Sequence, residues 1–273
     1  MEKLNIHIPG RSVPLYDPWE HAKMRADSYN SLQGDLTGID CKKCRNRGVI
    51  AHPRKDGSIY TTECDCMTMR KCVQEMERSG LKKSIRELTF DRFRAEQPWQ
   101  QTIKAGAQRY AKNPEGWLLF SGQSGCGKTH LCTAVCRELL ARGKEVRYMS
   151  WREKSGELKG LSTDPEARAK LLDTYKRAEV LYIDDLFKVG RSPEGRCEPT
   201  AGDVNLAFEL LNHRYCDRLT TIISTEWLPV ELAQIDEATG SRIVEMAMNS
   251  TFQISRDMGH NYRLRSVVKT ITN

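Results

Sequence analysis

Residues 117–129 read WLLFSGQSGCGKT, an apolar run followed at once by a glycine-rich loop, and they decide the fold. Gly122, Gly127, Lys128 and Thr129 fit the pattern G-x-x-x-x-G-K-[ST], in which glycines let backbone N–H groups close around phosphates. The next stretch, THLCTAVCRELLARG, predicts a helix whose positive end faces the bound anion. The sequence therefore predicts a strand, a phosphate-binding loop and a helix in direct succession.

The loop assigns an expected contact to each part of a nucleotide such as ATP. Lys128 is expected at the β- and γ-phosphates, and the hydroxyl of Thr129 at Mg²⁺. The run VLYIDD places Asp184 at the end of another buried strand, where it is expected to hold the same Mg²⁺, and Asp185 is the candidate base that orients the attacking water. The predicted nucleotide-binding residues are Gly122, Gln123, Ser124, Gly125, Cys126, Gly127, Lys128, Thr129 and Asp184.

Short apolar strands alternate with helices on both sides of this loop. The expected strands are 117–121, 146–151, 180–184 and 220–225, and the expected helices are 128–142, 165–178 and 203–217. Strands that read as continuous apolar runs between helices are typical of a parallel sheet covered on both faces. The fold class predicted for this part of the chain is α/β.

Four of the ten cysteines cluster within residues 41–66, CKKCRNRGVIAHPRKDGSIYTTECDC. Cys41 and Cys44 form a C-x2-C pair, and Cys64 and Cys66 form a tighter C-x-C pair. Four thiolates in two pairs favour tetrahedral Zn²⁺, and so short a segment would fold only together with its metal. Because C-x-C is unusual, Cys72 or His52 is an alternative ligand, and ordinary buried cysteines or an iron–sulfur cluster remain alternatives to zinc.

Composition and charge narrow the class of protein. The chain has 273 residues, 39% of them hydrophobic and 29% charged, a mean hydropathy of −0.60 and a net charge of +7. No apolar run approaches the ~18 residues of a membrane span, and the amino terminus lacks the apolar segment of a secretory signal. We therefore expect a cytoplasmic protein with reduced thiols and no membrane partner. The basic excess permits contact with nucleic acid without establishing it.

Several motifs together resemble one family. GQSGCGKTHL, VLYIDDL, TTIIST, IDEATGSRI and NYRLR are similar to motifs of the AAA+ ATPases of the DnaC/DnaI-type replicative helicase loaders. LTFDRF is similar to the short box that opens the AAA+ module, and CKKC…CDC resembles the zinc module of the Firmicutes and phage members. The resemblance covers residues 40–273.

The resemblance implies roles for further residues. Phe90 and Phe93 are expected to flank the adenine. Arg242 is the candidate arginine finger that reaches a neighbouring subunit, and Arg263 is the candidate sensor in a small helical lid. With Asp185, these two arginines make up the predicted catalytic set. The sensor strand ends at Glu226, where family members often have Asn. A carboxylate cannot donate a hydrogen bond to phosphate, so the residue that senses the γ-phosphate stays open.

The resemblance also implies a domain organisation. An amino-terminal arm is expected over residues 1–36 and a zinc-binding helicase-interaction module over 37–75. A linker with the adenine-side box would occupy 76–100, and the AAA+ P-loop NTPase domain 101–273, with its lid from about residue 237.

The implied function is a weak ATPase that loads the replicative DNA helicase onto single-stranded DNA during replication initiation or restart. Its cofactors would be ATP, Mg²⁺ and Zn²⁺. Its partners would be the hexameric helicase, single-stranded DNA and further copies of itself. One alternative is an AAA+ ATPase helper of a transposase, which would typically lack the cysteine module. Another is a nucleotide-gated DNA-binding adaptor with little turnover.

Overall fold

The computed structural model describes residues 17–78, 87–192, 195–257 and 260–262. The chain divides into two compact units, Met1–Arg70 and Lys71–Asn273, and each is described by itself. The sequence analysis expects the corresponding boundary after residue 75. Among the described residues, none of the helices combines the length and the apolar character that crossing a bilayer requires.

Over residues 17–70 the amino-terminal unit holds one helix, one hairpin and the start of a second helix. Its elements are α1 (Pro18–Ser31), β1 (Val49–Pro53), β2 (Ile59–Glu63) and the first residues of α2 (Cys66–Arg78). Asp17 begins α1 by accepting a hydrogen bond from the N–H of Trp19. The strands pair antiparallel around a turn in which Gly57 has a φ of 87°, a value that favours glycine. The side chain of Asn30 exchanges two hydrogen bonds with the backbone of Ala51 and so attaches α1 to β1.

The carboxyl-terminal unit is built on a five-stranded parallel sheet with the order β4-β5-β8-β3-β9. The strands are β3 (Leu118–Gly122), β4 (Val146–Ser150), β5 (Val180–Leu186), β8 (Thr220–Thr225) and β9 (Thr251–Ile254). Every side chain of β3 is buried, as expected for a central strand of a parallel sheet. The arrangement confirms the predicted α/β class, and all four strands expected from the sequence are present.

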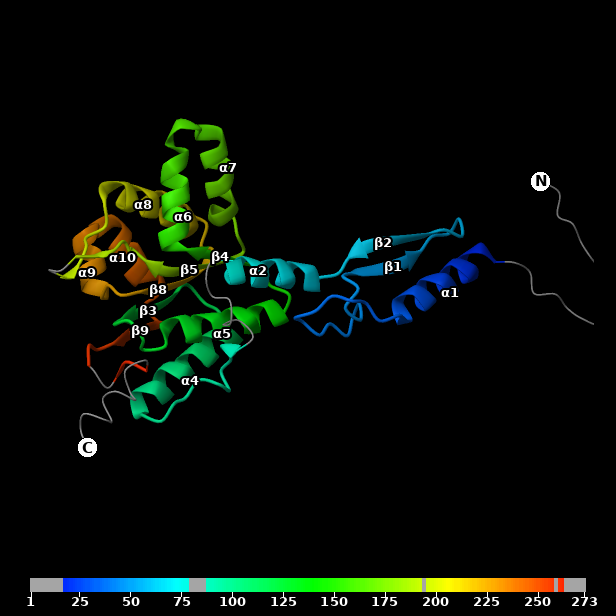
Figure 1. Ribbon diagram of the computed structural model, residues 1–273, viewed down its shortest axis with the longest axis horizontal. Helices are drawn as coiled ribbons and strands as arrows, with labels where there is room; N and C mark the ends of the chain where they lie inside the picture. The colour runs from blue at the N-terminus through cyan, green and yellow to red at the C-terminus, as the bar shows by residue number, and fades with distance from the viewer. Residues whose placement is uncertain (1–16, 79–86, 193–194, 258–259, 263–273) are drawn as a thin grey trace, which may run out of the picture. The chain divides into compact units, whose positions relative to one another are not determined.

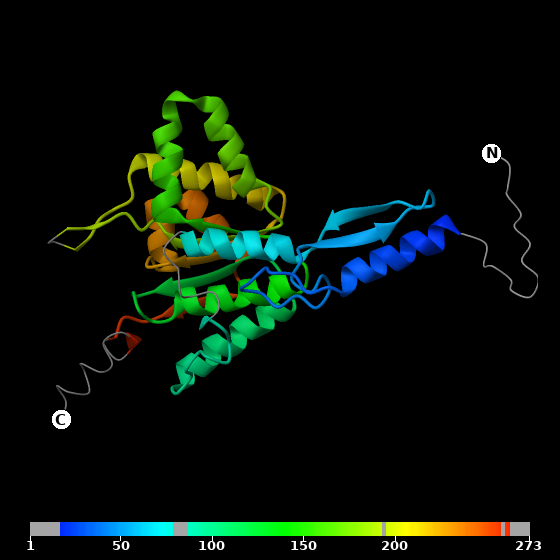
Figure 2. The same cartoon turned by 45° about the vertical axis from the view of Figure 1, so that its right-hand side comes forward.

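Helices cover both faces of this sheet. On the lower side in Figures 1 and 2 lie α4 (Pro98–Lys112) and α5 (Lys128–Ala141), and on the upper side lie α6 (Trp151–Gly160), α7 (Pro165–Lys176) and α8 (Ala201–Cys216). The helices α9 (Pro229–Ile235) and α10 (Glu237–Met246) pack against each other, and α10 also packs against α8. The sequence analysis placed α5, α7 and α8 within a few residues of their bounds and did not identify α4, α6, α9 and α10.

The edge strand β9 lies within the range predicted for the lid, which begins at about residue 237. Residues Thr251–Ile254 pair in parallel with Leu119–Gly122 of β3, so the segment from residue 237 onward contains α10 and one strand of the sheet. The ring of Phe252 stacks on Phe120 with centroids 4.9 Å apart and lies against Gly106 of α4. Only four residues form this strand, and their sequence carries no long apolar run that would have indicated it.

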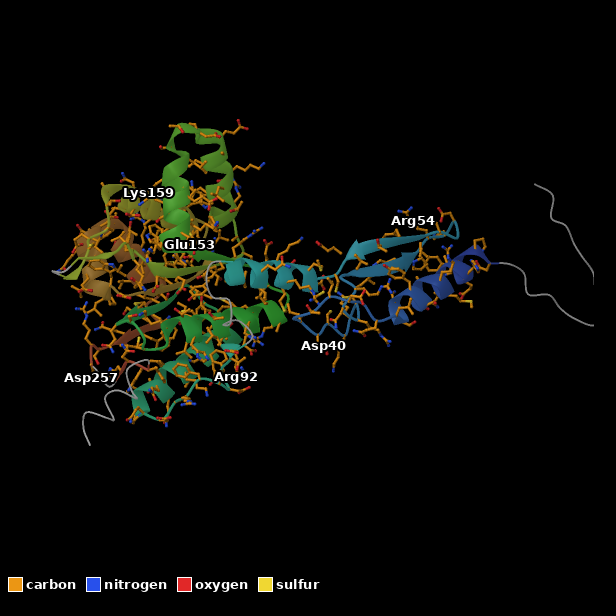
Figure 3. The ribbon with its side chains drawn as sticks, in the orientation of Figure 1. Asp40, Arg54, Arg92, Glu153, Lys159 and Asp257 are labelled. Atoms are coloured by element: carbon orange, nitrogen blue, oxygen red, sulfur yellow. The ribbon has the colours of Figure 1, made fainter. Side chains whose placement is uncertain are left out.

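Two buried charged side chains join the upper helices. Arg214 of α8 is fully buried and donates to the carbonyl groups of Tyr175, Lys176 and Ala178, which end α7. Burial lowers the pKa of Arg214 to about 10. Asp203 is also buried; it closes a capping box at the start of α8 and accepts a 2.7 Å hydrogen bond from Lys159 of α6, labelled in Figure 3.

Candidate functional site

The phosphate-binding loop is a tight turn between β3 and α5. Gly122, Gly125 and Gly127 have φ values of 131°, 80° and 98°, which residues with a Cβ rarely adopt. A Cβ at Gly122 would lie 2.2 Å from the carbonyl oxygen of Ile254, so only glycine fits where β3 lies beside the edge strand β9. The helix α5 begins directly after the loop at Lys128, and its free N–H groups therefore point towards the loop.

Lys128 fills the interior of the loop. Its side chain is buried, and its Nζ donates to the carbonyl oxygens of Gly122 and Gln123, each at 2.8 Å. The side chain of Gln123 exchanges two hydrogen bonds, of 2.6 and 2.9 Å, with the backbone of Asp257, which is labelled in Figure 3. These contacts hold the ammonium group at the place where the motif predicts phosphate.

Four hydroxyl groups converge on the carboxylate of Asp184. Its Oδ1 accepts from Thr129 at 3.1 Å, from Tyr182 at 2.7 Å and from Ser224 at 2.5 Å, and its Oδ2 accepts from Tyr148 at 3.0 Å. Burial, followed by the negative charge of Asp184, raises the pKa of Tyr182 well above its ordinary value, so this phenol stays a donor. Asp184 is thus held beside the first turn of α5, as a shared Mg²⁺ ligand set requires.

Asp185 directly follows Asp184 in the sequence but has different neighbours. Its φ of 56° turns the chain, its N–H donates to Ser224 Oγ, and its carboxylate forms a 2.7 Å ion pair with Lys188. Burial and the neighbouring Asp184 raise the pKa of Asp185, while Lys188 acts in the opposite direction. Lys188 also lies 3.2 Å from Glu226, at the end of the sensor strand.

The phosphate loop, Thr129, Asp184, Asp185 and Lys188 border one cavity of about 540 Å³ in the carboxyl-terminal unit. Its lining residues are Leu88, Arg92, Phe93, Arg94, Ser124, Gly125, Gly127, Lys128, Thr129, His130, Asp184, Asp185, Lys188 and Tyr262. The structure therefore brings together the two ends of the predicted site, the loop and the strand-end acids. A cavity of this size, lined by lysines, carboxylates and aromatic rings, fits a nucleotide.

The two aromatic residues of the LTFDRF box lie in different places. Phe93 lines the cavity, where its ring meets His130 and Tyr262 at centroid distances of 5.2 and 5.9 Å. Phe90 is buried and instead lines a separate cavity of about 390 Å³ between α4 and α5. Of the pair expected at the adenine, Phe93 lines the cavity that holds the phosphate loop and Phe90 does not.

The two predicted arginines fall outside this cavity or outside the described residues. Arg242 lies on α10, with its guanidinium 5.5 Å from the ring centre of Phe208 and 5.4 Å from that of Tyr215, and it donates to the carbonyl of Ala238. Among the described residues that line the cavity, Arg242 does not appear. Arg263 lies outside the described residues, one position after Tyr262.

The amino-terminal unit contains a separate candidate metal centre. The sulfur atoms of Cys41, Cys44, Cys64 and Cys66 all lie within 4.8 Å of one another, with Sγ–Sγ distances of 3.9 Å for Cys41–Cys64 and 3.5 Å for Cys44–Cys66. Four sulfurs at about 2.3 Å from one Zn²⁺ in a tetrahedron lie about 3.8 Å apart. The four-cysteine cluster is therefore compatible with zinc.

Positive φ values after Cys44 shape the turn at the first cysteine pair. Arg45 and Asn46 have positive φ values, and Gly48 follows at 80°, so the chain turns back sharply after Cys44. The N–H of Gly48 donates to Cys44 Sγ at 3.3 Å. Burial alone would raise the pKa of Cys44, but this N–H and the neighbouring thiols lower it to about 6, which favours the thiolate.

The alternative ligands can now be placed. His52 points its ring at Tyr60 and Thr62, with a 2.8 Å hydrogen bond to the Thr62 hydroxyl, and is not part of the cluster. The side chain of Cys72 lies outside the described residues. The turn after Cys44 also depends on Arg70, which is buried and donates to Thr37, Ile39 and Asn46.

Residues 57–249 match the family described as IstB-like ATP binding protein. The chain belongs to this family. It is 32% identical over 225 residues to the phage-like element PBSX protein XkdC of Bacillus subtilis, covering 78% of this chain and 82% of that protein. It is 28% identical over 143 residues to the replicative helicase loader DnaC of Escherichia coli, covering 50% of this chain and 58% of DnaC.

A solved structure of a DNA replication initiation factor shares the fold, with a TM-score of 0.51 at 16% identity over 68% of this chain and 54% of that one. The relationship to DnaC confirms the family resemblance that the motifs indicated, and the parallel sheet with its helices confirms the AAA+ P-loop fold. As a member of this family, the chain is an ATP-binding AAA+ protein.

Sequence reasoning missed several residues around the site. Tyr148 and Tyr182 are apolar-looking members of predicted strands, and nothing in their spacing indicates that both hydroxyls meet Asp184. The resemblance placed Ser224 at the end of the sensor strand with Thr225 and Glu226, but it did not indicate the contact of Ser224 with Asp184. Tyr262 belongs to the NYRLR motif, but the motif did not indicate that this ring lines the cavity. Lys188 gave no signal, because it reaches the cavity through the turn that follows β5.

Proposed function

We propose that this protein is an ATPase that loads a replicative DNA helicase onto single-stranded DNA. The observation that supports the proposal most strongly is a single cavity that joins the phosphate loop to Asp184 and Asp185, in a chain related over half its length to a helicase loader. The four-cysteine cluster upstream supports it further, because a transposase helper is expected to lack such a module.

In this proposal the loop binds the phosphates of ATP, and the acids at the end of β5 bind the metal and orient the attacking water. Bound Mg²⁺ would neutralise the charge that develops on the phosphates during transfer to water. Lys128 exchanges its two loop carbonyls for phosphate oxygens, and Thr129 and Asp184, already in contact, hold the metal. Asp185, the residue after Asp184, would orient the water that attacks the γ-phosphate. Phe93 and Tyr262 offer aromatic surface to the base.

The amino-terminal unit would carry the helicase contact. Its Zn²⁺ would be held by Cys41, Cys44, Cys64 and Cys66, and the ion supplies folding energy rather than chemistry, since four protein ligands leave no open position. The AAA+ domain would bind single-stranded DNA and associate with further copies of the chain. Turnover is expected to be slow for the isolated chain.

One other candidate function is favoured by a specific observation. The match over residues 57–249 is to the IstB-like family, which agrees equally well with an AAA+ helper of a transposase. A nucleotide-gated adaptor with little turnover is the third possibility, and its site would bind ATP in the same way.

A helicase-loading experiment separates these functions. The purified chain is incubated with the replicative helicase of its host, ATP and single-stranded DNA coated with single-strand-binding protein, and the unwinding of an annealed oligonucleotide is recorded. We expect unwinding with the wild-type chain and none with Lys128→Ala, while Lys144→Met, which alters only a surface ion pair with Glu179, serves as control. No unwinding and no complex with the helicase, together with binding to a transposase, would make the protein a transposition helper. Loading without measurable phosphate release, with or without DNA, would make it an adaptor.

A further inference from the structure

The cavity contains a cation that the phosphate-loop motif does not account for. Lys188 lines it together with Lys128, Asp184 and Asp185. Its Nζ lies 2.7 Å from the carboxylate of Asp185 and 3.2 Å from that of Glu226, so one ammonium group bridges the expected base and the end of the sensor strand.

The backbone directs this side chain into the cavity. Asp185 and Phe187 both have positive φ values, 56° and 61°, and the N–H of Lys188 donates to the carbonyl of Asp185. Such a conformation is rare for phenylalanine and persists only where the surroundings enforce it. Here the Phe187 ring is buried against Trp151, and its carbonyl accepts from the indole of Trp227. The turn therefore buries Phe187 in the core and leaves Lys188 facing the site.

Glu226 explains why a cation is needed there. A residue at the end of this strand lies beside the strand-end acids, but a carboxylate offers phosphate only repulsion and no hydrogen-bond donor. The Glu226 side chain is 12% exposed and is in ion-pair contact with Lys188. Lysine carries three donors on a flexible stem, which suits a contact that changes with the ligand.

We propose that Lys188 binds the terminal phosphate of ATP and so distinguishes ATP from ADP, with Glu226 as its positioning residue. Without nucleotide the ammonium group is held by Asp185; with a γ-phosphate present it moves to the phosphate oxygens while Glu226 keeps hold of it. This exchange frees the Asp185 carboxylate to orient water only when there is a phosphate to transfer. The inference rests on the nucleotide-binding part of the proposed function and is independent of the helicase.

The test measures the preference for ATP over ADP without any turnover. The affinities of the full chain for Mg²⁺–AMPPNP and Mg²⁺–ADP are determined by titration calorimetry for wild type, Lys188→Met and the control Lys144→Met. Loss of one charge-assisted contact predicts that Lys188→Met lowers the AMPPNP-to-ADP affinity ratio about tenfold, through AMPPNP alone. The control keeps the wild-type ratio. An unchanged ratio in a Lys188→Met protein that binds ADP normally would overturn the proposal.

A second comparison tests the positioning role. Glu226→Ala is made alone and together with Lys188→Met. If Glu226 acts by holding Lys188, its removal lowers the ratio only while Lys188 is present, so the two substitutions are not additive. An equal loss in both backgrounds would show that Glu226 acts independently of Lys188. Because no helicase or DNA is present, failure of the loading function would leave these results unaffected, and failure of this inference would leave loading unaffected.

Discussion

The hydroxyl of Thr129 lies 3.1 Å from Oδ1 of Asp184, and this contact links the first turn of α5 to the end of β5. The two residues are far apart in sequence, and the register of the parallel sheet brings them together. Since β5 pairs with β8, the same register also places Ser224 within 2.5 Å of Asp184. The carboxylate thus lies in a fixed setting of hydroxyl groups beside the phosphate loop.

Asp184→Asn tests the metal role of this setting. The amide has nearly the same shape but carries no charge, and its NH₂ group cannot bind Mg²⁺. We expect phosphate release to fall by about a hundredfold or more, and the Mg²⁺ dependence of ATP binding to disappear, because metal and phosphate charge would no longer be balanced. Phosphate release and nucleotide binding with and without Mg²⁺ provide the measurement.

The matched control for this substitution is Asp173→Asn, which changes a half-exposed acid of α7 paired with Arg177. Its turnover should equal that of the wild type. If Asp184→Asn kept both turnover and Mg²⁺ dependence, the metal would have to be held elsewhere in the cavity.

The strands and the phosphate loop followed from local sequence, whereas the residues around them did not. Apolar runs ending in GQSGCGKT and IDD indicate strand ends directly, because the pattern and the chemistry lie in one segment. The strand β9 and the lysine at 188 depend on contacts between distant segments, and the turn that exposes Lys188 is enforced by Trp151 and Trp227. In the amino-terminal unit, spacing identified the four cysteines, whereas only the fold shows that His52 is not part of their cluster.

Cys64→Ser tests the metal centre. Purified wild-type protein should contain about one Zn²⁺ per chain, since four thiolates complete a single tetrahedral site. The variant should lose the metal and the folded structure of the amino-terminal unit, because zinc binding and folding are coupled in such modules. Elemental analysis gives the metal content, and limited proteolysis reports on residues 17–70.

Cys216→Ser is the appropriate comparison, because that thiol is exposed at the end of α8. It should retain zinc and the protease resistance of the wild type. Nucleotide binding should survive in both variants. A wild-type protein prepared without chelator that contains no zinc would refute the assignment of the four cysteines.

Arg214→Met tests the buried arginine of α8 that donates hydrogen bonds to the carboxyl-terminal end of α7. The substitution keeps much of the side-chain volume but leaves the carbonyl groups of Tyr175, Lys176 and Ala178 without their donor. Leaving a buried carbonyl group without its donor costs roughly 1–3 kcal/mol, so the midpoint of urea unfolding should fall markedly. Arg177→Met, next to the same helix end but exposed, should unfold like the wild type. Equal midpoints for the two variants would mean that water replaces the guanidinium.

Arg242 carries the last prediction, that hydrolysis needs a neighbouring subunit. Within its own chain the Arg242 guanidinium packs on Phe208 and Tyr215 of α8; Arg242 is half-buried, and Phe208 beside it is 39% exposed. If this surface meets the cavity of a second copy, the planar cation stabilises the charge that develops on phosphate, an effect of about 10³ or more in rate where it is best characterised. Arg242→Ala should then reduce turnover strongly with little change in ATP affinity. The loss of its ring contacts alone would cost only about 1 kcal/mol of stability.

A mixing experiment distinguishes this role from a purely structural one. Lys128→Ala chains do not bind ATP but keep Arg242, and Arg242→Ala chains bind ATP but lack the arginine. Mixed at concentrations where the chains associate, the two variants should regain part of the wild-type turnover, because an ATP site of an Arg242→Ala chain then receives the arginine of a neighbouring Lys128→Ala chain. Phosphate release over a range of mixing ratios measures the recovery, with Arg177→Ala replacing Arg242→Ala as the control. Full activity of Arg242→Ala alone, or no recovery in associated mixtures, would leave Arg242 as a support for the packing of α10 on α8.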